Sequence, residues 1–174
     1  MCIRDRVIDF CRYHDIWVIS DLAYAEIYFG DEPPPSILQV PGAKDIAVEF
    51  TSLIKTYSMP GWRIGFCCGN PLLIEALARV KSYLDYGAYT PIQVAATAAL
   101  NGPQDCVAEV REMYRERRDT LVEAFSQAGW EVPPPPASMF CWAPLPPEIA
   151  HVGSMAFAKL ALTEAKVAVS PGVG

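Results

Sequence analysis

The amino-acid sequence predicts an α/β protein. Three short apolar runs of strand length come first, and segments in which apolar residues recur at helical spacing follow them. Short, continuously apolar runs are typical of buried parallel strands, and the later periodicity is typical of helices. We therefore expect a mainly parallel sheet with helices packed against it. The expected strands are 16–20, 46–51 and 64–68.

The helical segments begin and end at residues that favour helix termini. Pro71 opens the first of them, Pro91 stands in a first-turn position of the second, and Gly129 follows the third. We place a domain change in or near the third, longest segment, so that residues 7–115 and 116–174 belong to different domains. The expected helices are 72–84, 92–100, 103–127 and 154–164, with a short strand at 139–142.

The two ends of the sequence differ from the rest. Residues 7–11 suit the end of an amphipathic helix, whereas residues 1–6 do not continue that pattern well. We interpret residues 1–6 as a non-native leader that resembles translated adaptor sequence; a native start is the alternative. Residues 169–174 stop in a loop, so we expect a chain that is truncated at both ends.

Composition and charge exclude several classes of protein. The net charge is −6, with 14 basic residues scattered among 20 acidic ones, which argues against nucleic-acid binding. No apolar run approaches the length of a membrane span. The six cysteines form no Cys-x-x-Cys pair and the two histidines are far apart, so we expect no metal site. Adjacent Cys67 and Cys68 are expected to pack as small hydrophobic residues in a reducing, cytoplasmic compartment.

Residues 51–65 place a hydroxyl, an amine and a guanidinium between two expected strands. Lys55 comes just after a strand, where a lysine can be partly desolvated and its neutral amine is then available as a nucleophile. Arg63 lies at the start of the next strand and suits a bidentate contact with a phosphate. Spacing alone allows a functional site or a structural ion pair equally well.

This segment resembles the cofactor-lysine signature of the class I/II (fold type I) aminotransferases, which depend on pyridoxal 5'-phosphate (PLP). The resemblance rests on Ser52, three residues before Lys55, and on the ending Gly-Trp-Arg-Ile-Gly at 61–65. Ile54 departs from the signature, which has a small residue there, and a branched side chain would crowd the cofactor. The resemblance implies that Lys55 is the catalytic residue that carries PLP, and that Ser52 and Arg63 hold its phosphate.

A second segment, residues 20–24, resembles the Asp-x-x-Tyr of the same family at the carboxyl end of a strand. Ligands of open parallel sheets bind outside the carboxyl ends of the strands. The resemblance implies that Asp21 pairs with the pyridine nitrogen of the cofactor and that Tyr24 donates a hydrogen bond to its ring oxygen. For Asp21 taken alone, the alternative is a helix cap or turn residue.

The resemblance extends over almost all of residues 7–174 and is greatest to the bacterial alanine and diaminopimelate aminotransferase branch. It implies the second half of the large PLP-binding domain, with a mainly parallel sheet and helices, plus the start of a small α/β C-terminal domain. It also places residues 83–93 near a homodimer interface, where Tyr86 or Tyr89 would reach the partner's active site. An aromatic cluster packed in the core or the interface is the alternative for these tyrosines.

The activity implied by the resemblance is transfer of an amino group between an L-amino acid and a 2-oxo acid. Alanine with 2-oxoglutarate is the first expectation, followed by aspartate and diaminopimelate-pathway substrates. No glycine precedes Gly30 and no arginine follows Arg118. The glycine-containing phosphate loop and the arginine that binds the substrate carboxylate are therefore missing, and we expect the 174-residue chain alone to be inactive. A PLP lyase or synthase of the same fold, and a non-catalytic domain that binds a partner, remain alternatives.

Overall fold

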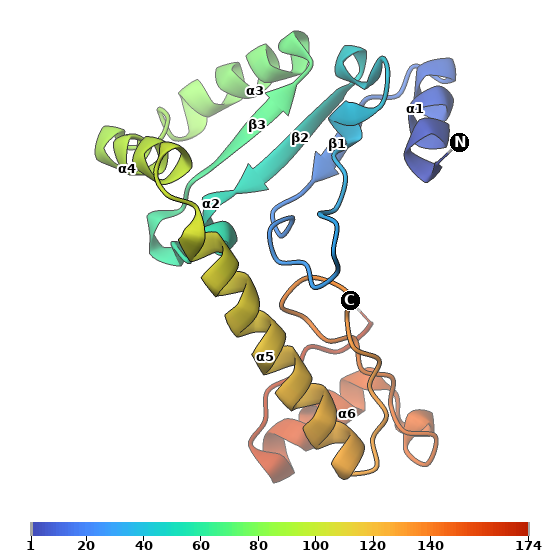
Figure 1. The fold of residues 1–174 in the computed structure, drawn as a ribbon. Helices are drawn as coiled ribbons and strands as arrows, with labels where there is room; N and C mark the ends of the chain where they lie inside the picture. Colours follow the sequence, from blue (N-terminus) through green and yellow to red (C-terminus); the bar gives the residue numbers. More distant parts are fainter. Residues whose placement is uncertain (1, 174) are drawn as a thin grey trace. The chain divides into compact units, whose positions relative to one another are not determined.

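The computed structural model describes residues 2–173, which form the α/β architecture that the sequence predicts (Figure 1). The chain divides into two units. The first runs to Arg115 and includes Pro136–Met139, and the second contains Glu116–Pro135 and the chain from Phe140 onward. The boundary falls inside the longest helix, α5 (Asp105–Gln127). The assignment of residues 7–115 and 116–174 to two domains of an aminotransferase stays a prediction.

The sheet of the first unit has three strands in the order β1-β2-β3. β1 (Val18–Asp21) and β2 (Ala47–Ser52) are parallel, whereas β2 and β3 (Gly65–Gly69) are antiparallel. The sheet is therefore mixed, and the expectation of a mainly parallel arrangement is corrected for β3. The chain between β2 and β3 holds only the one-turn helix α2 (Leu53–Thr56), a short 3-10 helix and loops. Parallel strands need a longer crossover, so this connection returns the chain in the opposite direction.

The strands are less buried than the apolar runs predicted. Ile19 in β1 is 72% exposed, and Phe66 in β3 is also exposed. β1 and β3 are the edge strands, so each has a hydrogen-bonded neighbour on one side only. An apolar run predicts a strand that is suited to burial, but it does not identify the segment that would pack over the strand.

The core of the first unit lies between β2 and α1 (Ile3–Tyr13). Ile8 of α1 and Ala47 of β2 are fully buried there, together with residues of the two short 3-10 helices before β2. The helix begins at Ile3, where the backbone N–H of Cys2 donates to Asp5 Oδ2 at 2.6 Å. The expectation that residues 3–6 do not continue the helical pattern is therefore wrong. The interpretation of residues 1–6 as a non-native leader stays a prediction.

Glu49 in β2 connects three parts of the first unit. Its carboxylate accepts hydrogen bonds from the hydroxyl of Ser20 in β1 at 3.2 Å, from the hydroxyl of Ser36 at 2.8 Å and from the backbone N–H of Ile37 at 2.9 Å. Hydrogen bonds to a charged acceptor are stronger than neutral ones. Glu49 therefore ties β1 and the start of the first 3-10 helix of the β1–β2 connection to β2.

The helices that follow β3 match the sequence predictions closely. They are α3 (Pro71–Leu84), α4 (Thr90–Asn101) and α5, and both α3 and α4 carry a proline in the first turn. Asn70 caps α3, because its Oδ1 accepts from the backbone N–H groups of Leu72 and Leu73. Its Nδ2 donates to the carbonyl of Asp45 at 2.7 Å, so this buried amide is satisfied on both sides.

The second unit is organised around Trp130. Its ring contacts Phe125 and Phe157, with centroids 4.8 and 5.6 Å away, and its Nε1 donates to the carbonyl of Pro144. Helix α6 (Ser154–Leu160) continues as a π-helical turn over Ala161–Ala165, where one helix was expected.

The strand expected at residues 139–142 is absent from the described part of the chain. The extended contact forms earlier, as an isolated antiparallel bridge between Tyr28 and Ala137 in the first unit. Prolines flank residues 139–142 on both sides. Because proline has no N–H to donate to a sheet ladder, the flanking backbone cannot extend a strand there.

Candidate active site

The residues predicted to bind the cofactor come from the carboxyl ends of β1 and β2. These strands are parallel, so their carboxyl ends meet at the same edge of the sheet. Asp21 is the last residue of β1 and Ser52 is the last residue of β2. Helix α2, which contains Lys55, follows β2 directly, and Figure 1 shows α2 at the end of β2. The topology therefore brings Asp21, Ser52 and Lys55 to one edge.

Lys55 and Tyr24 lie next to each other at this edge. Lys55 Nζ is 5.4 Å from the centroid of the Tyr24 ring, and both side chains are partly buried. A lysine over an aromatic ring is attracted by the ring's negative face. Tyr24 lies in the turn region after β1 and Lys55 in the turn after β2, so these two residues of the two sequence motifs are neighbours in the structure.

Ser52 has a structural role before any ligand is considered. It is the N-cap of α2, and its Oγ accepts from the backbone N–H of Ile54 at 3.3 Å. A hydroxyl that accepts in this way still has its own proton to donate to an anion. Ile54 is partly buried, and its carbonyl accepts from the N–H of Met59 at 3.0 Å.

Arg63 is held close to the end of β2 by the backbone around it. It ends a 3-10 helix with φ of 51°, in the left-handed region, and its side chain is exposed. The next residue, Ile64, accepts a hydrogen bond from the N–H of Leu53 at 3.2 Å. At Gly65 an added Cβ would lie 2.4 Å from the carbonyl oxygen of Thr51, so this signature glycine allows β3 to approach β2.

Asp21 is exposed, and its Oδ1 accepts from the backbone N–H of Ala23 at 3.0 Å. This is the turn role that was the alternative for Asp21, and it is compatible with a second contact from the other carboxylate oxygen. The N–H of Leu22 donates to the carbonyl of Phe50 at 2.9 Å, which continues the strand pairing past Asp21. The contact of Asp21 with a cofactor nitrogen stays a prediction.

The donor set at this edge fits PLP. The cofactor carries an aldehyde, a ring oxygen, a ring nitrogen and a phosphate. The edge offers an amine for the aldehyde, a phenol for the ring oxygen, a carboxylate for the nitrogen, and a hydroxyl and a guanidinium for the phosphate. These groups belong to Lys55, Tyr24, Asp21, Ser52 and Arg63.

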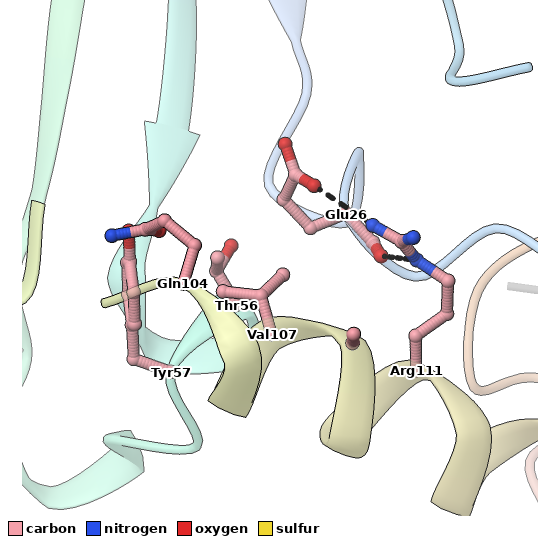
Figure 2. Close-up of a pocket in the computed structure, with 7 residues that line it drawn as sticks. Glu26, Thr56, Tyr57, Gln104, Val107 and Arg111 are labelled. Atoms are coloured by element: carbon pink, nitrogen blue, oxygen red, sulfur yellow. Dashed lines mark hydrogen bonds and ion pairs between the residues drawn. The ribbon is translucent and has the colours of Figure 1, made fainter.

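A cavity of about 330 Å³ borders the turn that carries Lys55, and sequence analysis did not identify its residues (Figure 2). Tyr57 donates a hydrogen bond to Gln104 Oε1 at 2.8 Å, and burial raises the pKa of the Tyr57 hydroxyl. No local pattern could have found this pair, because 47 residues separate its members. The cavity is lined by Glu26, Thr56, Tyr57, Gln104, Val107, Ala108 and Arg111.

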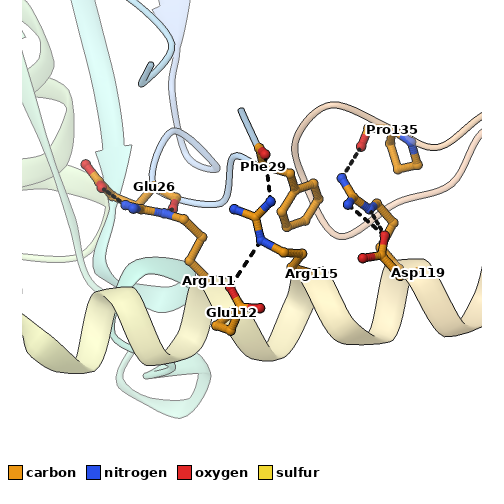
Figure 3. A network of polar contacts seen from close by, with 8 residues as sticks. Glu26, Phe29, Arg111, Glu112, Arg115, Asp119 and Pro135 are labelled. Atoms are coloured by element: carbon orange, nitrogen blue, oxygen red, sulfur yellow. Dashed lines mark hydrogen bonds and ion pairs between the residues drawn. The ribbon is translucent and has the colours of Figure 1, made fainter. Parts of the chain in front are cut away.

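Two arginines of α5 hold the segment that follows the β1 motif (Figure 3). Arg111 donates to the carbonyl of Glu26 at 3.0 Å and to its carboxylate at 3.2 Å, and its guanidinium lies 3.9 Å from the centroid of the Tyr28 ring. Arg115 donates to the carbonyl of Phe29 at 2.8 Å. Arg111 and Arg115 are four residues apart in an expected helix, and this spacing places both side chains on the same face of the helix.

Other kinds of site were also considered for residues 2–173. Within this range no group of three or more His, Cys, Asp or Glu side chains is placed to hold a metal ion. No helix in the same range combines the length and apolar character that crossing a membrane requires.

Comparison with known proteins identifies several similar sequences. AatC of Rhizobium meliloti, a putative aminotransferase, is 64% identical over 97% of this chain and 42% of its own length. The glutamate-pyruvate aminotransferase AlaC of Escherichia coli is 54% identical over 98% of this chain and 41% of its own length. An LL-diaminopimelate aminotransferase of Moorella thermoacetica is 46% identical over 97% of this chain and 42% of its own length. The chain thus spans about two fifths of the length of these relatives.

Solved structures show the same similarity in three dimensions. Substrate-bound BacF from Bacillus subtilis matches with a TM-score of 0.91 and 31% identity, over 97% of this chain and 42% of that chain. A probable N-succinyldiaminopimelate aminotransferase from Thermus thermophilus matches with a TM-score of 0.86 and 33% identity, over 97% of this chain and 44% of that chain.

The family model for class I and II aminotransferases matches residues 5–173, almost the whole chain. This match agrees with the two motifs at the carboxyl edge of β1 and β2. The chain therefore belongs to the class I and II aminotransferases, a family whose members use pyridoxal phosphate.

Proposed function

We propose that the protein containing this chain is a PLP-dependent aminotransferase that exchanges an amino group between glutamate and pyruvate. In one direction glutamate becomes 2-oxoglutarate and pyruvate becomes alanine. The observation that carries the proposal is the placement of Lys55 over Tyr24 at the carboxyl edge of two parallel strands. The substrate pair is supported by the 54% identity to the glutamate-pyruvate aminotransferase of E. coli.

In this proposal each side chain at the edge has one task. PLP, when bound, supplies an electrophilic carbon and an electron-accepting ring. The Lys55 amine holds the cofactor and later carries a proton to and from the α-carbon of the substrate. Asp21 keeps a proton on the ring nitrogen, and Tyr24 donates to the ring oxygen. The hydroxyl of Ser52 and the guanidinium of Arg63 bind the phosphate.

LL-Diaminopimelate is the second candidate amino donor. It is favoured by the 46% identity to an LL-diaminopimelate aminotransferase of M. thermoacetica. A lyase or synthase has less support, because the relatives reported above are named as aminotransferases. Parallel assays of the full-length protein with glutamate and with LL-diaminopimelate separate the two donors.

We also propose a cytoplasmic homodimer. All six cysteines are free, which supports a reducing compartment. Tyr86 is 92% exposed and Tyr89 is 72% exposed, so within this chain they do not pack in a core. Exposed aromatic side chains on the turn between α3 and α4 suit an interface with a second copy.

The proposed function is tested on the full-length protein with Lys55→Ala, and with Lys44→Ala as the matched control. Lys44 is exposed on a short 3-10 helix before β2 and outside the site. Loss of a proton-transferring residue reduces turnover by about 100-fold or more. We expect Lys55→Ala to lose the visible absorbance of the bound cofactor and nearly all glutamate–pyruvate turnover, whereas Lys44→Ala keeps both. A Lys55→Ala protein that retains absorbance and turnover would contradict the assignment.

The 174-residue chain expressed alone provides a separate test. We propose that it is inactive, because the phosphate loop and the substrate-binding arginine expected for the family lie outside it. Turnover of alanine with 2-oxoglutarate by the purified chain is the measurement, and sustained turnover would refute this part of the proposal.

A further inference from the structure

We propose that Tyr57 and Gln104 are positioning residues for Lys55, and that the hydrogen bond between them fixes the turn from which Lys55 projects. This inference rests on the proposed function of Lys55. It assigns to two residues outside the cofactor edge the task of holding the lysine in place.

The turn that carries Lys55 is too short to hold its own geometry. Helix α2 has four residues, and helices of this length are unstable without tertiary contacts. At its start the turn is anchored well, because Leu53 is 2% exposed and its N–H donates to the carbonyl of Ile64 at 3.2 Å. Its other end requires an anchor as well, since Lys55 lies in the second half of the turn.

Tyr57 supplies that anchor. It is the C-cap residue that directly follows α2, and its side chain has a different partner from that of Lys55. Lys55 Nζ lies over the Tyr24 ring. The Tyr57 hydroxyl donates to Gln104 Oε1 at 2.8 Å, and Figure 2 shows these two side chains next to each other. The turn is therefore held between the loop after β1 and the residue that precedes α5.

Gln104 is itself held in a fixed orientation. Its Nε2 donates to the carbonyl of Ala99 at 3.0 Å and to the carbonyl of Gly102 at 2.7 Å. Both protons of the amide are thus engaged at the junction of α4 and α5, and the oxygen faces Tyr57. A preorganised acceptor of this kind constrains its donor more than a mobile surface glutamine does.

The cavity beside the turn makes this hydrogen bond more important for its position. Thr56 and Tyr57 line this space of about 330 Å³ together with Val107 and Ala108 of α5. Close packing would restrain the turn without a hydrogen bond, but here the neighbouring space is not filled. Removing the Tyr57 hydroxyl therefore removes the tie between the turn and the start of α5. The turn then keeps only internal hydrogen bonds, such as those from the Met59 N–H to the Ile54 carbonyl at 3.0 Å and from the Thr56 hydroxyl to the Ser52 carbonyl at 3.2 Å.

Tyr57→Phe in the full-length protein tests the inference, with Tyr13→Phe as the control. Tyr13 is 83% exposed on α1, and its substitution also removes one hydroxyl. The first readout is amide hydrogen exchange of residues 53–58 in the cofactor-free protein. Loss of one hydrogen bond predicts exchange that is about 2- to 10-fold faster in Tyr57→Phe and unchanged in Tyr13→Phe. Equal exchange in both variants would overturn the inference.

Two further readouts separate positioning from a merely structural role. We expect Tyr57→Phe to alter the visible circular dichroism of the bound cofactor and to lower kcat with little change in KM. Faster exchange with an unchanged spectrum and an unchanged kcat would show that the hydrogen bond stabilises the fold without positioning Lys55. The exchange measurement needs no cofactor, so it can succeed even if the aminotransferase proposal fails in the Lys55→Ala experiment.

A double-mutant cycle tests whether Gln104 is the partner through which the Tyr57 hydroxyl acts. Gln104→Met removes the acceptor with little change in side-chain volume, and the double variant with Tyr57→Phe should be no worse than Gln104→Met alone. Additive effects on exchange and kcat would show that Tyr57 and Gln104 act independently, which would refute the pair.

Discussion

Gly65, the last residue of the lysine signature, gives a sharp test of the sheet that supports the site. In the antiparallel pairing of β2 and β3 it lies opposite Ser52, and an added Cβ would be 2.4 Å from the carbonyl oxygen of Thr51. Ordinary carbon–oxygen contacts are about 3.3 Å or longer, so Gly65→Ala must separate the strands by roughly 1 Å. Overpacking costs about 1–3 kcal/mol and a weakened ladder hydrogen bond about 1 kcal/mol more. We expect a loss of about 2–4 kcal/mol.

The matched control is Gly61→Ala, in the same signature. A Cβ at Gly61 meets no heavy atom within 4 Å, so this substitution should be neutral or stabilising by up to about 1 kcal/mol. Urea unfolding of the two full-length variants, followed by fluorescence and compared by midpoint and slope, measures the difference. If Gly65→Ala lies within about 0.5 kcal/mol of Gly61→Ala, the close approach of β3 to β2 does not require glycine and the reasoning fails.

Two further predictions concern single carboxylates. Asp21→Asn should retain bound cofactor but show a large fall in turnover, because a neutral amide cannot keep a proton on the ring nitrogen. Absorbance of the bound cofactor and steady-state rates check this. Unchanged turnover would show that Asp21 is not part of the site. On α3, a hydrogen bond from Lys81 lowers the pKa of Asp85. The stability that this exposed pair contributes is therefore present above the ordinary Asp pKa and is lost as the pH falls through the lowered value. Carboxyl NMR titration of Lys81→Met should show a higher pKa for Asp85, and an unchanged value would exclude Lys81 as the cause.

Local signals in the sequence predicted the helices and the two motifs. Pro71 and Pro91 stand in the first turns of α3 and α4, as their backbone restriction requires. Lys55 and Tyr24 belong to separate motifs, and their proximity could be predicted because parallel strands bring their carboxyl ends to one edge. These predictions depended on residues near in sequence or on a general rule of sheet topology.

The remaining features depend on contacts between distant residues. β3 runs antiparallel to β2. An apolar run in the sequence predicts a strand but not the direction in which it pairs. The exposure of Ile19 depends on which segments pack against the edge strand β1. The sequence of β1 does not determine this. The hydrogen bond of Tyr57 to Gln104 joins two common residue types that have no fixed spacing in the sequence.

The hydrogen bonds to Glu49 also define where the protein can be engineered. They hold Ser20 in β1 and Ser36 and Ile37 within the β1–β2 connection, so the mostly exposed residues 31–35 lie between two fixed points. For such a span each doubling of length costs only about 0.6 kcal/mol of closure entropy. A peptide tag or a small reporter domain inserted within 31–35 would therefore leave the register of β1 and β2 in place. Between Ser36 and Ile37 the same insertion would separate the two Glu49 contacts.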